Sequence, residues 1–342
     1  MTLEVHAGTA PPDWDDGLRA AGGTVFHSRA WADYTQAEQR GTTPHYVRLR
    51  QPDGSAAAWA LAFLDRSRHR LIAPISGALW LDSYPVTTPA GDATTLRAAL
   101  LELVRWARRR GVLEITIGSF ASPQREFALG ELGFTETRRL EFELDIRQPD
   151  DALLAGLEYK RRKNLRKAAR LGVQIVELQP DEGIALLRRM QAASSERIER
   201  RGGPRIGRTG EADHDPVHQL LRHGAGCLVG ATVDGEIVSA SLFTRFGPLV
   251  YHTLSGHGPK ALETQAPTLL IWEMLRRFRD EGAERFNFGG CSADAAREDS
   301  PEHGVYVYKK AFGAECIACT SGTRILWPAL HWAFSKARAL FP

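Results

Sequence analysis

The stretch from Phe286 to Gly313 has the residue types and spacing best suited to chemistry in this sequence. It reads FNFGGCSADAAREDSPEHGVYVYKKAFG: an apolar segment ends at two glycines, a polar loop follows, and aromatic residues then alternate with two lysines. At helical spacing Val305, Tyr308 and Phe312 share one stripe, which predicts a helix packed on a sheet. Lys309 flanks that stripe, so its ammonium could reach a cleft above the preceding strand and stabilise an anion there. The alternative is an amphipathic helix with two solvated lysines.

A strongly basic segment is the second candidate functional element. It runs from Tyr159 to Arg170 and holds seven cations in 12 residues: Lys160, Arg161, Arg162, Lys163, Arg166, Lys167 and Arg170. In a helix these side chains form rows at i, i+4 spacing, which repel one another unless an anion is near. Phosphate groups would offset that repulsion, whereas the alternative is a solvated basic helix. More arginines follow at Arg197, Arg200, Arg201, Arg205 and Arg208. We therefore expect an anionic substrate, and the Gly202–Gly210 loop is either a lid or an ordinary loop.

Other catalytic patterns are absent from the sequence. The histidines are scattered and no Gly-x-Ser-x-Gly elbow occurs, which argues against nucleophilic hydrolase chemistry. Cys316-x-x-Cys319 has no second Cys or His pair, so we expect no metal site, and the pair fits an alternating strand.

Length and composition are those of an ordinary soluble protein. The chain has 342 residues, enough for two domains, with 43% hydrophobic and 25% charged residues and a net charge of +3. No apolar run approaches the roughly 18 residues of a membrane span, and the N-terminus shows no export signal. The sequence therefore predicts a cytoplasmic protein with no membrane span.

The predicted elements occur twice in the same order, β-α-α-β-β-β-α-β-α-β. LLELVRWARRRGVLEITIGSF in the first half aligns with LLIWEMLRRFRDEGAERFNFGG in the second, and Asp53-Gly54 and Asp234-Gly235 both predict hairpin turns. We therefore predict an α+β fold made of two tandem domains, 1–148 and 149–325, followed by a helix, 326–342, packed across both. The predicted elements include the helices Asp92–Arg110, Pro123–Leu132 and Asp151–Leu171 and the strands Arg70–Leu81, Thr135–Ile146 and Ala314–Arg324.

This order resembles the GNAT acyltransferase fold, and two copies in tandem resemble the FemABX family of aminoacyl-tRNA-dependent transferases. The resemblance covers nearly the whole chain and is carried by YKRRKNLRKAARLGV, APTLLIWEMLRRFRDEGAERFNFGG and GVYVYKKAFGAE. It implies transfer of an aminoacyl group from charged tRNA to an amine acceptor, with peptide-bond formation and aminoacyl-tRNA as co-substrate in place of a cofactor. We expect a monomer.

The resemblance also implies roles for single residues. Lys309 would stabilise the tetrahedral oxyanion, with Tyr308 as its catalytic neighbour. The residues implied in substrate binding are Tyr306, Tyr251, Arg197, Trp31 and Tyr34. Those implied in binding tRNA phosphates are Arg162, Lys163, Arg166, Lys167 and Arg170.

Three functions remain open from the sequence. Gly256-x-Gly258-x-x-Ala261 lies where a GNAT protein grips coenzyme A, but Thr253 replaces the usual Gln or Arg, and the next helix is predicted to begin only near Ala266. An acyl-CoA-dependent N-acyltransferase is the first alternative, and a non-catalytic RNA-binding or scaffold protein is the second. The helix after Trp31 lacks the basic residue that holds a nucleotide-sugar pyrophosphate in compact relatives, which argues against a cell-wall precursor as acceptor and leaves a smaller amine, in a peptide-like natural product, as an equal alternative.

Overall fold

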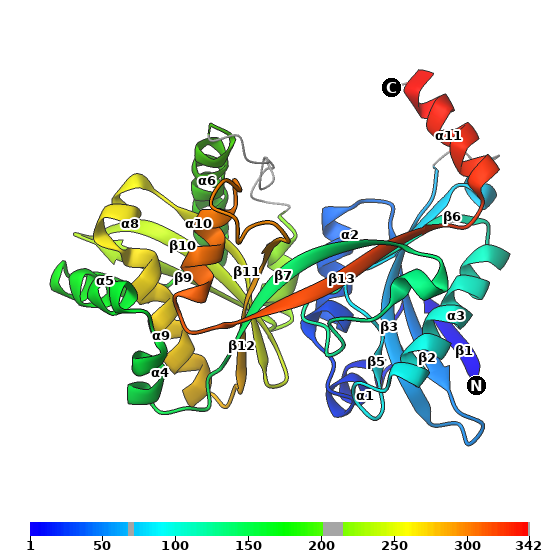
Figure 1. Cartoon of the computed structure of the whole chain (residues 1–342), viewed down its shortest axis with the longest axis horizontal. Helices are drawn as coiled ribbons and strands as arrows, with labels where there is room; N and C mark the ends of the chain where they lie inside the picture. Colours follow the sequence, from blue (N-terminus) through cyan, green and yellow to red (C-terminus); the bar gives the residue numbers. More distant parts are fainter. Residues whose placement is uncertain (68–71, 201–214, 341–342) are drawn as a thin grey trace. The chain divides into compact units, whose positions relative to one another are not determined.

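The computed structural model describes residues 1–67, 72–200 and 215–340, which form two compact units (Figure 1). The N-terminal unit comprises Met1–Arg139 and Ala318–Pro342, and the C-terminal unit comprises Leu140–Ile317. Both units combine helices with a mixed sheet, as the predicted α+β class requires. The division falls inside two strands, whereas the sequence repeat places the limits at 148/149 and 325/326.

The sheet of the N-terminal unit has the strand order β1-β2-β3-β4-β6-β13. Neighbours are antiparallel except β4 and β6, which are parallel because a helix crosses between them. Its strands are β1 (Thr2–Ala7), β2 (Thr43–Arg50), β3 (Ala56–Asp65), β4 (Gly77–Leu81), β5 (Val86–Thr87), β6 (Val112–Ile117) and the second part of β13 (Glu315–Ile325). Its helices are α1 (Trp14–Ala20), η1 (Val25–His27), α2 (Arg29–Glu38), η2 (Ala73–Ile75), α3 (Ala93–Arg109), η3 (Leu129–Leu132) and α11 (Pro328–Leu340).

The C-terminal unit repeats this plan with the strand order β7-β12-β11-β10-β9-β8. Here β11 and β12 are the parallel pair, and the strands from β11 to β8 pair antiparallel with their neighbours. Its strands are the second part of β7 (Thr135–Asp145), β8 (Gln174–Glu177), β9 (Gly226–Val233), β10 (Glu236–Phe246), β11 (Leu249–His257) and β12 (Arg285–Ser292). Its helices are α4 (Asp150–Gly156), α5 (Tyr159–Arg170), α6 (Pro180–Glu199), α7 (Val217–Arg222), α8 (Pro259–Thr264), α9 (Ala266–Asp280) and α10 (His303–Lys310).

Each unit takes its last strand from the other half of the sequence. The second part of β13 pairs with β6, so Ile325 lies opposite Glu114 in the N-terminal unit. The second part of β7 lies beside β12 in the C-terminal unit, where Ile146 N donates to Glu284 O at 2.9 Å. The repeat predicted both strands but assigned each to its own half of the chain, and that assignment differs from the compact units.

The crossover helix α3 shows why the sequence forms these elements locally. Asp92 caps its N-terminus and accepts hydrogen bonds from the backbone N–H groups of Thr94 and Thr95. Apolar residues recur every three or four positions and are buried, including Leu96, Leu100, Leu103 and Val104. Gly111 ends the helix with φ of 69°, a conformation that glycine adopts without strain. The predicted helix Asp92–Arg110 is therefore confirmed.

Four predicted elements differ from the observed ones. The helix predicted over Pro123–Leu132 is only the 3-10 turn η3, and the helix predicted over Asp151–Leu171 is broken into α4 and α5 by an extended Leu157. The strand predicted over Arg70–Leu81 begins only at Gly77 and partly falls outside the described residues. The predicted helix Ala266–Asp280 is confirmed as α9, but a six-residue helix, α8, begins at Pro259, so the expectation that no helix opens before Ala266 is wrong.

The start of the C-terminal helix α11 lies against β6 of its own unit, and the rest of the helix extends away from the sheet (Figure 1). His331 Nε2 lies 3.1 Å from Glu114 Oε2. The expectation that this helix spans both domains remains a prediction. In the described part of the chain, no helix is both long and apolar enough to cross a membrane.

Candidate active site

Lys309 lies in the last turn of α10 and reaches back to strand β12. Its Nζ donates to Gly290 O at 2.8 Å and lies 6.0 Å from the centre of the Phe142 ring, which is fully buried. Phe312 anchors α10 by packing on Phe288, with ring centres 5.3 Å apart. The predicted stripe therefore packs on the sheet, and Lys309 extends beside it toward the end of the preceding strand.

Three polar groups surround Gly289 at the point where β11 and β12 separate. The parallel pairing of these two strands ends at Tyr251 and Asn287. A Cβ atom at position 289 would lie 3.5 Å from each of three atoms, namely Lys309 Nζ, Tyr251 Oη and His252 O. Gly289 has φ of 74°, which disfavours any other residue. Glycine here keeps open a small space bordered by an ammonium and a phenol hydroxyl, both hydrogen-bond donors.

A buried carboxylate on β7 is hydrogen-bonded to residues of β11 and β12 beside this space. Glu141 is 1% exposed, and its Oε1 lies 3.4 Å from Tyr251 Oη. Its Oε2 accepts a hydrogen bond from Asn287 Nδ2 at 3.1 Å, and Asn287 Oδ1 accepts one from Gly289 N at 2.7 Å. These bonds tie β7, β11 and β12 together beside Lys309. The sequence analysis did not identify Glu141 or Asn287, because nothing in the local pattern places β7 next to β12.

His252 is half-buried beside the same space and is uncharged at neutral pH. Burial, and secondarily the charge of Lys309, lowers its pKa to about 3. The ring stacks on Phe243 at 4.8 Å, and its Nε2 lies 3.3 Å from Ser241 Oγ. A neutral imidazole with a low pKa is a poor proton acceptor, so His252 contributes packing and its backbone carbonyl rather than base catalysis.

Tyr308 lies away from the Gly289 space and links helices. Its ring packs on Phe312 at 5.4 Å and on the guanidinium of Arg161 at 4.3 Å. Burial raises its pKa to about 12, although the nearby Arg161 charge and a hydrogen bond with Thr268 oppose that shift. These contacts give Tyr308 a packing role, and they do not support the catalytic role implied for it by the resemblance.

The other implied tyrosines also separate in the structure. Tyr251 is 7% exposed and borders the Gly289 space. Tyr306 is half-buried, and its ring packs edge-on against the Phe142 ring with centres 5.5 Å apart. Its hydroxyl oxygen accepts a hydrogen bond from Lys310 Nζ at 3.4 Å. Lys310 is exposed and points to Tyr306, so the choice of Lys309 over Lys310 agrees with the geometry.

Helix α5 presents two classes of cation. Arg161 is 8% exposed and donates to Thr268 Oγ1 at 3.0 Å and to Tyr308 O at 3.2 Å. Burial lowers its pKa. Arg162 is half-buried and donates to Ala155 O at 3.0 Å, near the end of α4. Both arginines hold α5 in place. Arg162 therefore has a structural role in addition to the phosphate-binding role implied for it by the resemblance.

The remaining cations of α5 form an exposed basic face. Its members are Lys160, Lys163, Arg166, Lys167 and Arg170. None of them forms an ion pair with a carboxylate among the residues that the structure describes. Like charges on one helix face repel, so this surface favours an anionic partner. Arg197 lies in α6, but its side chain falls outside the described residues, as do Arg201, Arg205, Arg208 and the whole Gly202–Gly210 loop.

This chain matches one family model and is similar in fold to several solved structures. Residues 159–310 match the family model described as an acetyltransferase (GNAT) domain. FemX superimposes with a TM-score of 0.77 over 97% of this chain and 99% of its own, at 15% identity. A tandem GNAT protein from the clavulanic acid biosynthesis pathway gives a TM-score of 0.54 over 95% and 99%, at 14% identity. L-PGS from Bacillus licheniformis gives 0.54 over 92% of each chain, also at 14% identity.

The chain has a tandem GNAT fold. The predicted fold is confirmed, and Lys309, Gly289 and Glu141 all belong to the second GNAT-like unit.

The first GNAT-like unit contains its own half-buried carboxylate. Trp31 stacks on Tyr34 with ring centres 4.7 Å apart, and Trp31 Nε1 donates to Asp82 Oδ2 at 2.7 Å. Burial raises the pKa of Asp82 to about 6. The structure thus stacks Trp31 on Tyr34, both implied in substrate binding, and Trp31 also bonds an acid that the sequence analysis missed.

The glycine segment of the second GNAT-like unit serves packing. A Cβ atom on Gly256 would lie 2.7 Å from Gln191 N in α6, so this strand can approach α6 only with glycine at that position. Gly258 precedes α8 and donates its N–H to Val238 O at 2.9 Å. The helix therefore begins directly after the glycines, which removes one of the sequence-based objections to acyl-CoA.

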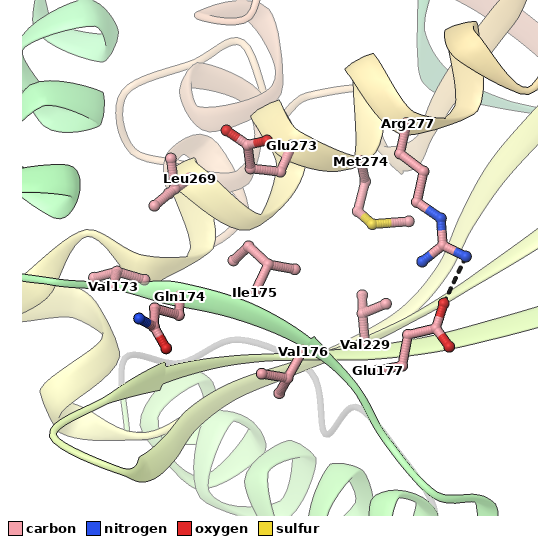
Figure 2. A pocket seen from close by; sticks show the side chains of 10 residues that line it. All are labelled: Val173, Gln174, Ile175, Val176, Glu177, Val229, Leu269, Glu273, Met274 and Arg277. Carbon is pink, nitrogen blue, oxygen red and sulfur yellow. Dashed lines mark ion pairs between the residues drawn. The ribbon is translucent and has the colours of Figure 1, made fainter.

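A second hollow lies at the far edge of the same sheet (Figure 2). It has a volume of about 450 Å³ between edge strand β8 and helix α9, and Ile175, Val229 and Met274 line it. Glu177 and Arg277 pair across its rim at 2.6 Å. Two strands separate β8 from β11 and three separate it from β12, so this hollow is not part of the Lys309 site.

The four cysteines are free thiols, and no cluster of three metal-ligating side chains occurs in the described ranges. Cys316 and Cys319 lie in β13, which confirms the predicted strand.

Proposed function

We propose that this protein is an aminoacyltransferase of the FemABX type. In this reaction an aminoacyl group moves from the 3′ end of charged tRNA to an amine, and a peptide bond forms. The tandem GNAT fold supports an acyltransferase, and the exposed basic face of α5 supports an anionic donor. The acceptor is the amine of a peptide-like natural product or of a cell-wall precursor.

The observation that carries the proposal is the position of Lys309 beside Gly289. In aminoacyl transfer, a neutral acceptor amine attacks the ester carbonyl carbon, and the carbonyl oxygen becomes an oxyanion. The Lys309 ammonium and the Tyr251 hydroxyl border the same space, and the ammonium can donate to that oxygen. When the C–O bond to the ribose breaks, the amine proton passes to the leaving hydroxyl. Tyr251 donates its single hydroxyl proton to Glu141, so it lines the space and Lys309 is the donor to the oxyanion.

The ester is already activated, so positioning supplies much of the rate. The bond from Lys309 Nζ to Gly290 O limits the motion of the ammonium before substrate arrives. This restraint lowers the reorganisation needed when charge develops in the transition state.

An acyl-CoA-dependent N-acyltransferase is the second candidate. The family model over residues 159–310 is described as an acetyltransferase domain, and α8 begins directly after Gly258. The same lysine could stabilise the oxyanion formed from a thioester, so the identity of the acyl donor decides between the two proposals.

The test is a direct comparison of donors. The full chain is incubated with tRNA charged with radiolabelled amino acids, and in parallel with labelled acetyl-CoA, over a panel of amine acceptors. We expect label transfer from tRNA that stops after RNase treatment. Transfer from acetyl-CoA alone would replace the proposal by the second candidate. Tight RNA binding without transfer from either donor would favour a scaffold protein.

A further inference from the structure

Exposed apolar side chains gather where β13 ends and α11 begins in the N-terminal unit. Within positions 325–332, Ile325 is 44% exposed, Trp327 39%, Leu330 38% and Trp332 66%. Between them His331 fixes the helix to Glu114 of β6. Large apolar residues that remain exposed together mark an interaction surface.

A hollow lined mainly by arginines lies directly beside these apolar residues. Its volume is about 670 Å³, and it is lined by Arg66, Ala73, Ile75, Arg108, Arg109, Arg110 and Gly111. The guanidinium of Arg108 lies 5.3 Å from the centre of the Trp327 ring, which joins the hollow to the apolar residues. Ile75 on its rim is 41% exposed. We call this combined surface the α11 surface.

The hollow concentrates positive charge without a compensating acid. Arg66 donates to the carbonyl oxygens of Ala73 at 2.7 Å and of Arg110 at 2.6 Å. None of the four arginines pairs with a carboxylate in the part of the chain that the structure describes. Burial and the neighbouring charge of Arg110 lower the pKa of Arg66. A bound anion would relieve this crowding, and phosphate is the anion that guanidinium groups bind best.

The combination of arginine, tryptophan and aliphatic side chains on the α11 surface distinguishes among three possible partners. Nucleic acid would use the arginines and the tryptophans, but it would gain nothing from Ile75, Ile325 and Leu330. A second copy of this chain would place arginines against arginines. A membrane surface satisfies every group, because tryptophan and aliphatic side chains enter the boundary of the acyl chains while arginines contact lipid phosphates. The sequence of α11, PALHWAFSKARAL, has two basic residues and no acidic one.

We propose that the α11 surface docks this protein on membranes that contain anionic phospholipids. The proposal is independent of the aminoacyltransferase assignment, since it rests on a different unit and on different residues. It describes peripheral binding, in which one helix and the adjacent hollow lie at the lipid headgroups.

The experiment measures partition of the full chain onto vesicles of phosphatidylcholine with or without phosphatidylglycerol. Three variants are compared with the wild type. The first combines Arg108→Gln, Arg109→Gln and Arg110→Gln, the second is Trp332→Ala, and the control combines Arg166→Gln, Lys167→Gln and Arg170→Gln on α5. The control removes the same charge from a surface of the other unit.

We expect binding only to vesicles that contain phosphatidylglycerol. The hollow variant should lower the partition coefficient on the order of 100-fold, since each arginine near an anionic surface contributes about fivefold. Trp332→Ala should lower it about tenfold, if about half of that side chain enters lipid. Trp332 is largely exposed, so its replacement should leave folding unchanged and keeps the test valid if the arginine variant is unstable.

Several results would overturn the proposal. Wild-type protein that fails to bind anionic vesicles is one, and equal losses in the hollow variant and the α5 control are another. Loss of tRNA binding in the hollow variant with vesicle binding unchanged would assign the surface to RNA. A change in oligomeric mass on Trp332→Ala, with vesicle binding unchanged, would assign it to a second copy of this chain.

Discussion

Asn287 connects the buried Glu141 carboxylate to the backbone of Gly289. Its Nδ2 donates to Glu141 Oε2 at 3.1 Å, and its Oδ1 accepts from Gly289 N at 2.7 Å. One amide side chain thus bridges a strand from the middle of the sequence and the glycine that borders Lys309. Both hydrogen bonds of Asn287 therefore hold the residues around this space in position. Substitutions of these residues should affect turnover and the free energy of unfolding to different extents.

Replacing Lys309 by alanine should lower turnover on the order of 100-fold, because the oxyanion then has one donor fewer. The free energy of unfolding should change little, since Lys309 is only half-buried and water can replace its ammonium at Gly290 O. Lys310→Ala is the matched control, because Lys310 is exposed and contacts Tyr306 instead. Equal turnover in the two variants would remove Lys309 from catalysis.

Gly289→Ala should reduce both stability and turnover. The positive φ alone costs about 1 kcal/mol. The added methyl group would also enter the space bordered by Lys309 and Tyr251. Gly282→Ala isolates the first effect, because Gly282 has φ of 84° with nothing within 4 Å of an added Cβ. We expect similar losses of stability by denaturant unfolding, with turnover reduced only at position 289. Full activity of Gly289→Ala would show that the reacting carbonyl does not occupy this space.

Glu141→Ala should lower the free energy of unfolding by about 2–4 kcal/mol. It removes an acceptor from both the buried Asn287 amide and the Tyr251 hydroxyl, and each such loss costs about 1–3 kcal/mol. Glu143→Ala, two residues further along β7, removes a carboxylate that pairs with Arg285, and we expect a smaller loss because Arg285 is 39% exposed and water can replace that partner. Chemical denaturation of the two variants checks the difference, and equal losses would refute a special role for Glu141.

Asp82→Asn should change how stability depends on pH. Burial raises the pKa of Asp82 to about 6, above its ordinary value of 3.8. Between these pH values the folded protein holds a proton that the unfolded chain has released, so wild-type stability falls as pH rises through this window. The asparagine variant lacks this loss and should gain about 2–3 kcal/mol relative to wild type between pH 4 and pH 6.

Only the difference between variant and wild type is informative in that experiment. Burial lowers the pKa of His27 to about 4, and this histidine contributes the opposite slope in the same window. Trp31 can still donate to the asparagine oxygen, so the local hydrogen bond survives the change. A constant difference in the free energy of unfolding from pH 4 to pH 6 would show that Asp82 titrates normally.

Neutralising Arg166, Lys167 and Arg170 together should weaken tRNA binding and reduce its salt dependence. For every phosphate that no longer meets a cation, the slope of log K against log salt should fall by about 0.7–0.9. The matched control is the triple glutamine variant of Arg108, Arg109 and Arg110, which removes equal charge elsewhere. Binding titrations at several salt concentrations check the result. An unchanged slope would exclude this face of α5 from tRNA binding.

Local sequence determined most of the elements and the residue that borders the site. Asp92 and Gly111 limit α3, and the stripe of Val305, Tyr308 and Phe312 predicts α10, because capping and periodicity act over a few residues. The same stripe places Lys309 at its edge. These features need no knowledge of distant parts of the chain.

The tertiary structure decided which of those residues meet. The repeat predicted β7 and β13, but it could not show that each joins the opposite unit, since strand pairing between distant segments leaves no local signal. That pairing brings Glu141 within hydrogen-bonding distance of Tyr251 and Asn287, next to Gly289. The contact of the Tyr308 ring with the Arg161 guanidinium, and the bond from Arg161 to Thr268, likewise depend on tertiary packing and could not be predicted from local sequence. Side-chain type and spacing follow from the sequence, whereas proximity and burial arise only when distant strands pair.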